Sequence, residues 1–345
     1  MKRTSIIFII LLFITNATYA GSSALPWVEL TFRPSTETKT DSQIRLLPTE
    51  AEQTEGDAVP LYQKAIKSLP EDFQQQKFLD WRKLPSEPDQ LPIEEIESEL
   101  KKLKPTIDLL TQAARCKQCN WPFIKPGQIQ QQDMDDLAIY RQLAIILDVQ
   151  AKIQIVQGQY DKAIETIKTN LKLANHLGSA SSLVQAIVGN AIGYINLGRI
   201  EQLIQSHNAP NLYHALKDLP KPLADVNKAI KVETDNLKNY NFLVRPQFRK
   251  ILEPAHEQIR KQMNHVERKI TALQIIEALR LYTGKHDGKF PEKLSDITES
   301  KIPNDPVTKK PFSYSRIGSK AILELEGTEG SEGRDAIRYE LNLKE

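Results

Sequence analysis

The strongest constraint on the fold comes from one predicted helix, which covers residues 134–157. Apolar side chains occupy most of its circumference, and such a helix is normally central and covered by its neighbours. We therefore expect a layered and mainly α-helical protein in which further helices surround this one. The apolar positions are Leu137, Tyr140, Leu143, Ile146, Leu147, Val149, Ile153 and Val156.

Two similar segments, about forty residues apart, predict helical hairpins. Gly158-Gln159-Tyr160-Asp161-Lys162-Ala163 follows the central helix, and Ile195-Asn196-Leu197-Gly198-Arg199-Ile200-Glu201 echoes Ile155–Asp161 at the same relative positions. Residues 137–206 therefore resemble two hairpins of the tetratricopeptide type. The resemblance implies that Gly158 and Gly198 permit tight turns, that Tyr160 and Ile200 pack across them, and that Ala163 lets two helices approach closely. It also implies a stack with a concave surface for a peptide or protein partner.

The distribution of glycine and proline along the chain predicts where its structural units begin. Glycine is sparse (14) and proline fairly common (20), and the prolines cluster at segment joints, as expected of a helical protein. Residues 21–56 alternate Pro, Ser, Thr and Glu with little apolar periodicity, which predicts a flexible leader. Asp57 can cap the first helix, with Pro60 in its first turn. We therefore expect a domain of α-helical hairpins over residues 57–250.

The last part of the chain predicts a small α+β unit over residues 251–345. A long helix is expected from about Ala255 to Tyr282. Alternating apolar residues then appear in three short stretches that are separated by Gly318 and by the Gly327–Gly333 loop. They predict a three-stranded antiparallel sheet, whose apolar face should pack against the long helix because so small a sheet is unstable alone.

Residues 270–345 also resemble the C-terminal part of pseudopilins of type II secretion systems. The matching pieces are Ala272–Tyr282, Gly288-Lys289-Phe290-Pro291-Glu292-Lys293-Leu294 and Asn304-Asp305-Pro306-Val307. The resemblance implies a reused module rather than fibre assembly, because this helix lies deep inside the chain and begins with charged residues. The whole chain looks like a group of uncharacterised secreted bacterial helical proteins, notably at Arg115-Cys116-Lys117-Gln118-Cys119-Asn120-Trp121-Pro122 and Asn211-Leu212-Tyr213.

The first twenty residues have the pattern of a secretory signal peptide. Lys2 and Arg3 precede an apolar run from Ile6 to Ile14, and Thr18-Tyr19-Ala20 then provides the small residues of a cleavage site. The run is shorter than the roughly 20 apolar residues that a membrane-spanning helix needs. We therefore expect cleavage after Ala20, a periplasmic or secreted mature protein, and no stable membrane insertion after cleavage.

Cys116 and Cys119 are the two cysteines of the chain, and their roles remain open at this point. In an oxidising compartment a structural disulfide is the leading interpretation. A redox pair needs a stabilised thiolate, usually at a helix N-terminus, whereas this pair ends a helix. Half of a zinc site or two free thiols are the other possibilities.

The remaining sequence favours binding over catalysis. The formal net charge of +2 falls to zero once the two basic residues of the signal are removed, which argues against a general nucleic-acid-binding protein. No HExxH, Gly-x-Ser-x-Gly, P-loop or dinucleotide motif is found, so no catalytic residue, cofactor or metal is predicted. Asn211-Leu212-Tyr213-His214 and Asn239-Tyr240-Asn241-Phe242 place aromatic rings among amides, as sugar-binding surfaces or helical cores do.

We therefore expect a non-catalytic interaction or scaffold protein of the bacterial cell envelope with an unknown protein or peptide partner. One alternative is an accessory component of a secretion or pilus-like system. Another is an envelope enzyme, either thiol-dependent or acting on polysaccharide.

Overall fold

The computed structural model describes residues 27–36, 38, 40–122, 131–236, 238, 245–331, 333 and 335–344, with the backbone alone at residues 131–136, 245, 248 and 251. The expected signal peptide, residues 1–20, lies outside these ranges. The strands are β1 (Val28–Phe32), β2 (Thr54–Asp57), β3 (Cys116–Gln118), β4 (Ser313–Ile317), β5 (Lys320–Leu325) and β6 (Ile337–Leu343). The helices are α2 (Ala58–Lys67), α3 (Gln75–Lys83), α4 (Ile93–Lys102), α5 (Lys104–Arg115), α6 (Gln131–Val156), α7 (Tyr160–Gly178), α8 (Leu183–Gln205), α9 (Tyr213–Lys217), α10 (Val226–Asn236) and α11 (Arg245–Lys285).

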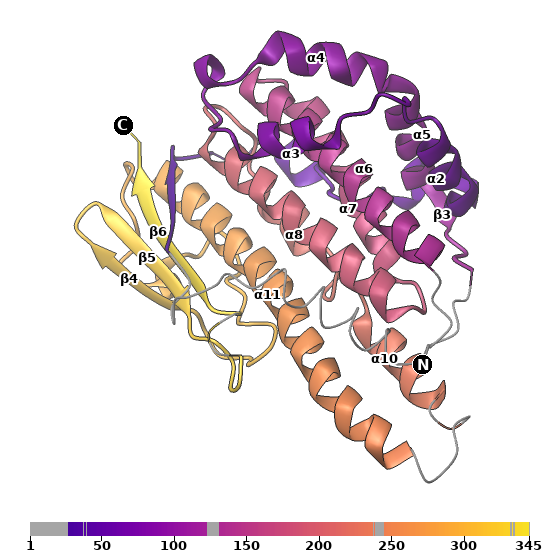
Figure 1. Cartoon of the computed structure of the whole chain (residues 1–345). Helices are drawn as coiled ribbons and strands as arrows, with labels where there is room; N and C mark the ends of the chain where they lie inside the picture. Colours follow the sequence, from indigo (N-terminus) through magenta and orange to yellow (C-terminus); the bar gives the residue numbers. More distant parts are fainter. Residues whose placement is uncertain are drawn as a thin grey trace.

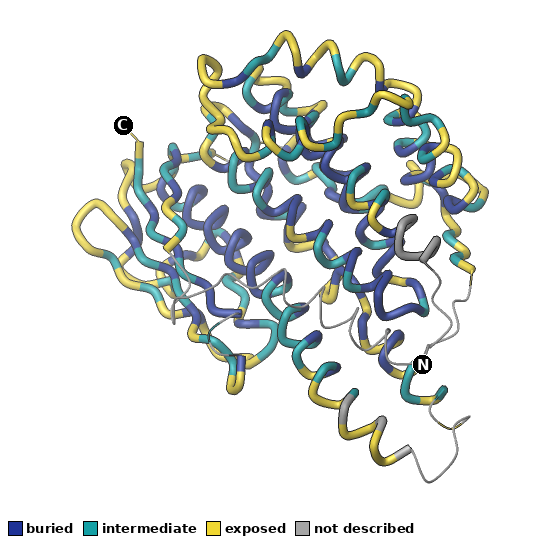
Figure 2. The backbone as a smooth tube through the Cα atoms, in the orientation of Figure 1, coloured by how far each residue is buried: buried dark blue, intermediate teal, exposed yellow. Residues whose placement is uncertain are grey.

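The chain is mainly helical, with a small sheet at one side (Figure 1). The sheet lies beside α8 and α11, α6 and α7 form the next layer, and α2 to α5 cover the side farthest from the sheet. Buried residues concentrate in α6, α7, α8 and the C-terminal half of α11, whereas α4 and the start of α11 are largely exposed (Figure 2). The predicted central helix is thus buried almost all round from Leu143 to Ile153, as its apolar circumference requires.

The first predicted hairpin is present, whereas the prediction of a second hairpin turn at Gly198 is wrong. Gly158 adopts a φ of +71° between α6 and α7, where a left-handed backbone favours glycine. Ala163 is fully buried at the start of α7, so the two helices approach closely there. Gly198 instead lies inside α8, which continues without a turn past Ile200. The buried residues Leu197, Ile200, Leu203 and Ile204 extend the apolar face of the helix through this point, and this packing outweighs the weak helix propensity of one glycine.

Helices α7 and α8 pack closely because small residues meet between them. A Cβ atom added to Gly189 would lie 2.6 Å from the carbonyl oxygen of Ala174 and from the backbone nitrogen of Gly178. Gly178 itself faces Ala224, whose Cβ would be 2.4 Å away from an added Cβ. Gly189 therefore fixes the spacing of α7 and α8, and Gly178 lets the segment before α10 approach α7.

The sheet has four strands in the order β1-β6-β5-β4, not the three that the sequence predicts. The antiparallel strands β4, β5 and β6 are where they are expected, and β1 adds to β6 in parallel, with Leu30 opposite Leu341 and Phe32 opposite Leu343. The described residues between 28 and 57 therefore belong to the folded body rather than to a flexible leader. Leu30, Phe32 and Leu46 are almost completely buried, and a strand with two inward-facing residues is too short to give a clear periodicity.

Helix α11 joins the helical layers to the sheet. It begins at Arg245, so it crosses the expected boundary between residues 250 and 251. Its buried residues, among them Ile270, Leu273 and Ile276, share one apolar core with α6, α7 and α8 on one side and with β5 and β6 on the other. None of the helices within the described residues is both long and apolar enough to cross a membrane.

A buried ion-pair cluster ties α11 to two loops of the C-terminal unit. The Arg268 guanidinium donates to both carboxylate oxygens of Asp305, at 3.1 and 3.0 Å, and lies 3.4 Å from a carboxylate oxygen of Asp335. It also donates to the backbone oxygens of Asp335 and Glu326. All three charged side chains are at most 1% exposed, so Arg268 holds the segments before β4 and before β6 against the helix.

Candidate binding cleft

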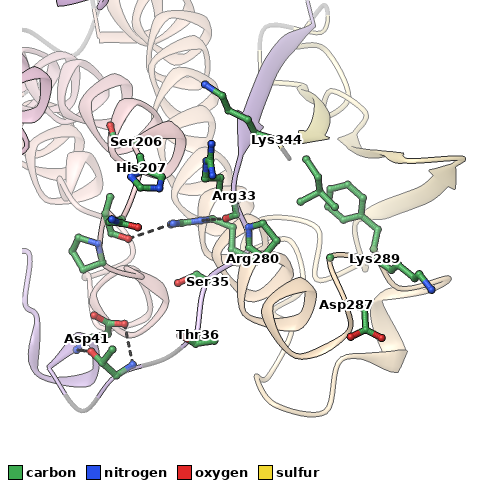
Figure 3. A pocket seen from close by; sticks show the side chains of 18 of the residues that line it. Arg33, Ser35, Thr36, Asp41, Ser206, His207, Arg280, Asp287, Lys289 and Lys344 are labelled. Carbon is green, nitrogen blue, oxygen red and sulfur yellow. Dashed lines mark hydrogen bonds between the residues drawn. The ribbon is translucent and has the colours of Figure 1, made fainter.

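An open cleft of about 1310 Å³ lies at one end of the molecule. Its walls come from chain segments where elements end: the stretch after β1, the turn between α6 and α7, the loop after α8, the loop after α11, the turn between β4 and β5, and the end of β6. The cleft therefore lies where the helical layers meet the end of the sheet (Figure 3). Loops carried by a rigid scaffold are the usual location of binding residues.

Arg280 contributes to the floor of the cleft, and its charge is already compensated. Its guanidinium donates to Glu277 at 2.8 Å and to the backbone oxygen of Ala209. Glu277 is fully buried and also accepts hydrogen bonds from the Asn211 amide and the Leu212 N–H. Burial raises the pKa of Glu277, and the interactions with Arg280 and Leu212 oppose that rise. Arg280 and Glu277 thus act as a structural pair beneath the cleft.

Arg316, on the sheet side, is likewise committed to local structure. Its guanidinium donates to the backbone oxygens of Gly318 and Phe290 at 3.1 Å and to the carboxylate of Glu292 at 2.7 Å. These bonds join the turn between β4 and β5 to the loop that follows α11. They define a wall of the cleft but leave little positive charge for a ligand.

Arg33 and Lys344 lie next to each other at the ends of two parallel strands. Phe32 pairs with Leu343, and the Lys344 N–H donates to the Phe32 carbonyl at 2.9 Å, which continues the ladder by one step. Paired residues of neighbouring strands point to the same face, with the strands about 4.8 Å apart. Figure 3 shows both side chains extending toward the side on which Ser206 and His207 lie.

A glycine fixes the position of the wall that carries Arg33. The Ser35 N–H donates to the carbonyl of Arg280 at 3.0 Å, which holds the stretch after β1 against the last turns of α11. A Cβ atom added to Gly284 would lie 2.0 Å from the backbone oxygen of Ser35. Only glycine therefore allows this contact without displacing the backbone.

Two of the residues that the sequence predicts at hairpin turns lie in this cleft. Gly158 and Tyr160 line the cleft, and the Tyr160 hydroxyl donates to the His207 carbonyl at 2.6 Å, so it bridges the α6–α7 turn to the loop after α8. Ala163, Gly198 and Ile200 are elsewhere in the helices. The sequence does not predict the pairing of Arg33 with Lys344, because they stand near opposite ends of the chain and the five residues of β1 give no clear strand periodicity.

The predicted disulfide is wrong: Cys116 and Cys119 are free thiols. Cys116 begins the extended strand β3, and residues three apart in an extended chain are about 10 Å apart. A disulfide needs Cα atoms within about 7 Å of each other. Burial raises the pKa of both thiols, and the nearby Asp57 carboxylate adds to the rise, so neither is a ready thiolate.

The aromatic residues around these cysteines form core structure. The Tyr62 ring stacks on Trp121 with ring centroids 5.8 Å apart, and its hydroxyl lies 2.8 Å from Nδ1 of His176. The Trp121 indole donates to the His176 carbonyl. This cluster packs α2 and α7 against the segment that follows β3.

Other candidates do not assemble into a reactive site. Asn211 and Tyr213 are buried, and the Tyr213 hydroxyl donates to the Lys301 carbonyl, so these groups support the fold rather than a sugar-binding surface. The similar stretch at residues 239–242 lies outside the described residues. Across the part of the chain that the structure describes, no three His, Cys, Asp or Glu side chains come together as a metal site.

Comparison with known proteins gives no family for this chain. No family model matches it, and no match was found among the curated proteins or the solved structures.

Proposed function

We propose that this chain is a non-catalytic binding protein of the bacterial cell envelope and that the cleft receives an extended segment of a protein partner. The observation that carries the proposal is the cleft itself, with its volume of about 1310 Å³ and its walls of hydroxyl groups, main-chain groups and charged side chains. A cleft of this size exceeds the usual volume of a small-molecule pocket, which is about 300–1,000 Å³. It suits a chain that lies along it.

Residues that line the cleft support binding more than turnover. Its acidic side chains are Asp41, Asp161 and Asp287, and the first of these accepts a hydrogen bond from the Thr38 N–H. The Ser206 hydroxyl donates to the Gln202 carbonyl and also interacts with the Tyr160 side chain, so local structure already engages it. Nucleophilic catalysis needs an activated nucleophile held by a base.

The proposal is tested by selecting binders from a displayed library of unstructured twelve-residue peptides against the purified mature protein. We expect binders that compete with one another and that lose affinity when Ser319, an exposed residue of the cleft wall, is replaced by Trp. Replacement of Ser86, exposed on the opposite helical side, by Trp serves as the matched control. Bound peptides should be recovered with unchanged mass.

Two outcomes would contradict the proposal. Peptides whose affinity is unaffected by Ser319→Trp would bind elsewhere, and a peptide recovered cleaved or modified would indicate an enzyme. The cell-envelope location is tested separately, by fractionation and by N-terminal sequencing of the mature protein, which should begin at Gly21.

A further inference from the structure

Two neighbouring cations in the cleft have no counter-ion within the described residues. Arg33 and Lys344 occupy adjacent positions on the same face of the β1–β6 pair, and neither takes part in an ion pair there. Like charges on neighbouring strands repel each other. The native structure therefore contains a repulsion that a bound anion would relieve.

Arg280 and Arg316, which also line the cleft, do not behave in the same way. Arg280 is paired with Glu277, and Arg316 is paired with Glu292 and with two backbone carbonyls. Their charges are compensated by groups of the protein itself, whereas those of Arg33 and Lys344 are available to a ligand. Figure 3 shows the Arg33 and Lys344 side chains beside the end of β1, in the cleft that Ser206 and His207 also line.

We propose that the segment received by the cleft is acidic and that carboxylates of its Asp or Glu residues pair with Arg33 and Lys344. This inference rests on the proposed function and specifies the chemistry of the partner. A guanidinium binds a carboxylate with two parallel hydrogen bonds, and a neighbouring ammonium adds a third donor. The hydroxyl and main-chain groups of the remaining walls suit the amides of a peptide.

The lining residues favour a peptide over a nucleic acid. Single-stranded nucleic acids bind by stacking their bases on exposed aromatic rings in a strongly positive groove. The aromatic residues described in this cleft are Tyr160, whose hydroxyl is bonded to the His207 carbonyl, and Phe290, which is 2% exposed. Asp161 and Asp287 also reduce the positive charge of the walls.

The inference is tested with fluorescent twelve-residue peptides that differ only in charge: alternating Glu-Ser, Gln-Ser and Lys-Ser repeats. We expect the Glu peptide to bind at least ten-fold more tightly than the Gln peptide, with an affinity that falls as salt is raised. Arg33→Gln with Lys344→Gln should weaken the Glu peptide at least ten-fold. Lys67→Gln with Lys101→Gln makes the same charge change on exposed helix surfaces and should leave binding unchanged.

The melting temperature provides a second readout of peptide binding. The Glu peptide should raise the melting temperature of the wild-type protein more than that of the Arg33→Gln/Lys344→Gln variant. Arg33→Glu with Lys344→Glu should transfer the preference to the Lys peptide.

The possible failures are distinguishable. If peptides selected from the library bind in the cleft but the Glu and Gln peptides bind equally, the acidic partner is refuted and the binding function stands. If no peptide binds in the cleft, both proposals fall. If a twelve-residue oligothymidylate binds more tightly than the Glu peptide and depends on Arg33 and Lys344, the ligand is a nucleic acid and the inference is wrong.

Discussion

Gly189 and Gly198 belong to the same helix but lie in opposite surroundings. An added Cβ would meet the backbone of α7 at Gly189, whereas nothing lies within 4 Å of it at Gly198. We expect Gly198→Ala to raise the free energy of unfolding by about 1 kcal/mol, because alanine favours the helix interior. Gly189→Ala should lower it by about 1–3 kcal/mol through overpacking. Urea denaturation followed by circular dichroism measures both changes.

The outcome for Gly198 also tests the helical assignment. If Gly198 were in a left-handed turn, as the sequence predicts, alanine would strain the backbone and destabilise the protein. A loss of stability in Gly198→Ala would therefore contradict a continuous α8.

The two cysteines give a chemical prediction. Because burial raises the pKa of both thiols, the native protein should react slowly with iodoacetamide at pH 8, and faster once it is unfolded in guanidinium chloride. Mass spectrometry of the alkylated, unfolded protein should show two added groups. A mass two hydrogens below that of the reduced protein, with no alkylation, would show that the disulfide is present and would contradict this prediction.

Single residues were predictable where their effect is local. Asp57 caps α2 by accepting a hydrogen bond from the Val59 N–H, and Gly158 makes its turn, as their sequence contexts indicate. Arg33 and Lys344 depend on pairing between distant strands, and the state of the cysteines depends on the extended course of β3. Local sequence carries neither kind of information.

At the scale of elements, the Arg268 cluster determines how α11 holds the loops of the C-terminal unit. Burial alone would raise the pKa of Asp305, but hydrogen bonds from Arg268 and Thr308 outweigh it, so that the pKa is lowered. Replacing one partner leaves an unpaired buried charge. We expect Arg268→Leu to lower the free energy of unfolding by about 3–5 kcal/mol.

Calorimetry of this variant checks the prediction, with Lys77→Gln as the control. Lys77 pairs with Glu95 at the exposed surface and should contribute nothing measurable. An Arg268→Leu melting temperature equal to that of the wild type would show that the cluster does not hold the loops.

The longest elements were the most predictable. α6 is apolar over most of its circumference, and α7 and α11 carry apolar stripes over several turns, so these helices follow from the sequence pattern. The β4–β6 strands follow from alternation. β1 has only five residues in a segment rich in Ser, Thr and Pro, and two inward side chains are too few for a signal. The cleft was not predictable, because its walls come from six chain ends that only the tertiary fold brings together.

For the whole molecule, two buried histidines predict how stability depends on pH. Burial, aided by Lys172, lowers the pKa of His176 to about 3, and burial, aided by Lys269, lowers that of His265 to about 4. Both imidazoles are therefore neutral when folded but gain protons below about pH 6.5 when unfolded. The stabilisation is complete above pH 6.5 and is lost as the pH falls toward 4.

Each histidine should contribute a slope of up to about 1.4 kcal/mol per pH unit within this range. Urea midpoints measured between pH 7.5 and pH 5 test the slope. The double variant His176→Gln/His265→Gln should be less stable at pH 7.5 but should have a flatter profile. An unchanged slope in that variant would exclude these residues as its source.

The pairing of β1 with β6 has a consequence for the time course of folding. Val28 faces Tyr339, so the first strand finds its partner only after nearly the whole polypeptide has been synthesised. At about 5–20 residues per second, the ribosome needs roughly 15–60 s to make the intervening chain. During that interval β1 has no strand to pair with, and the end of the sheet that carries Arg33 and Lys344 is assembled last.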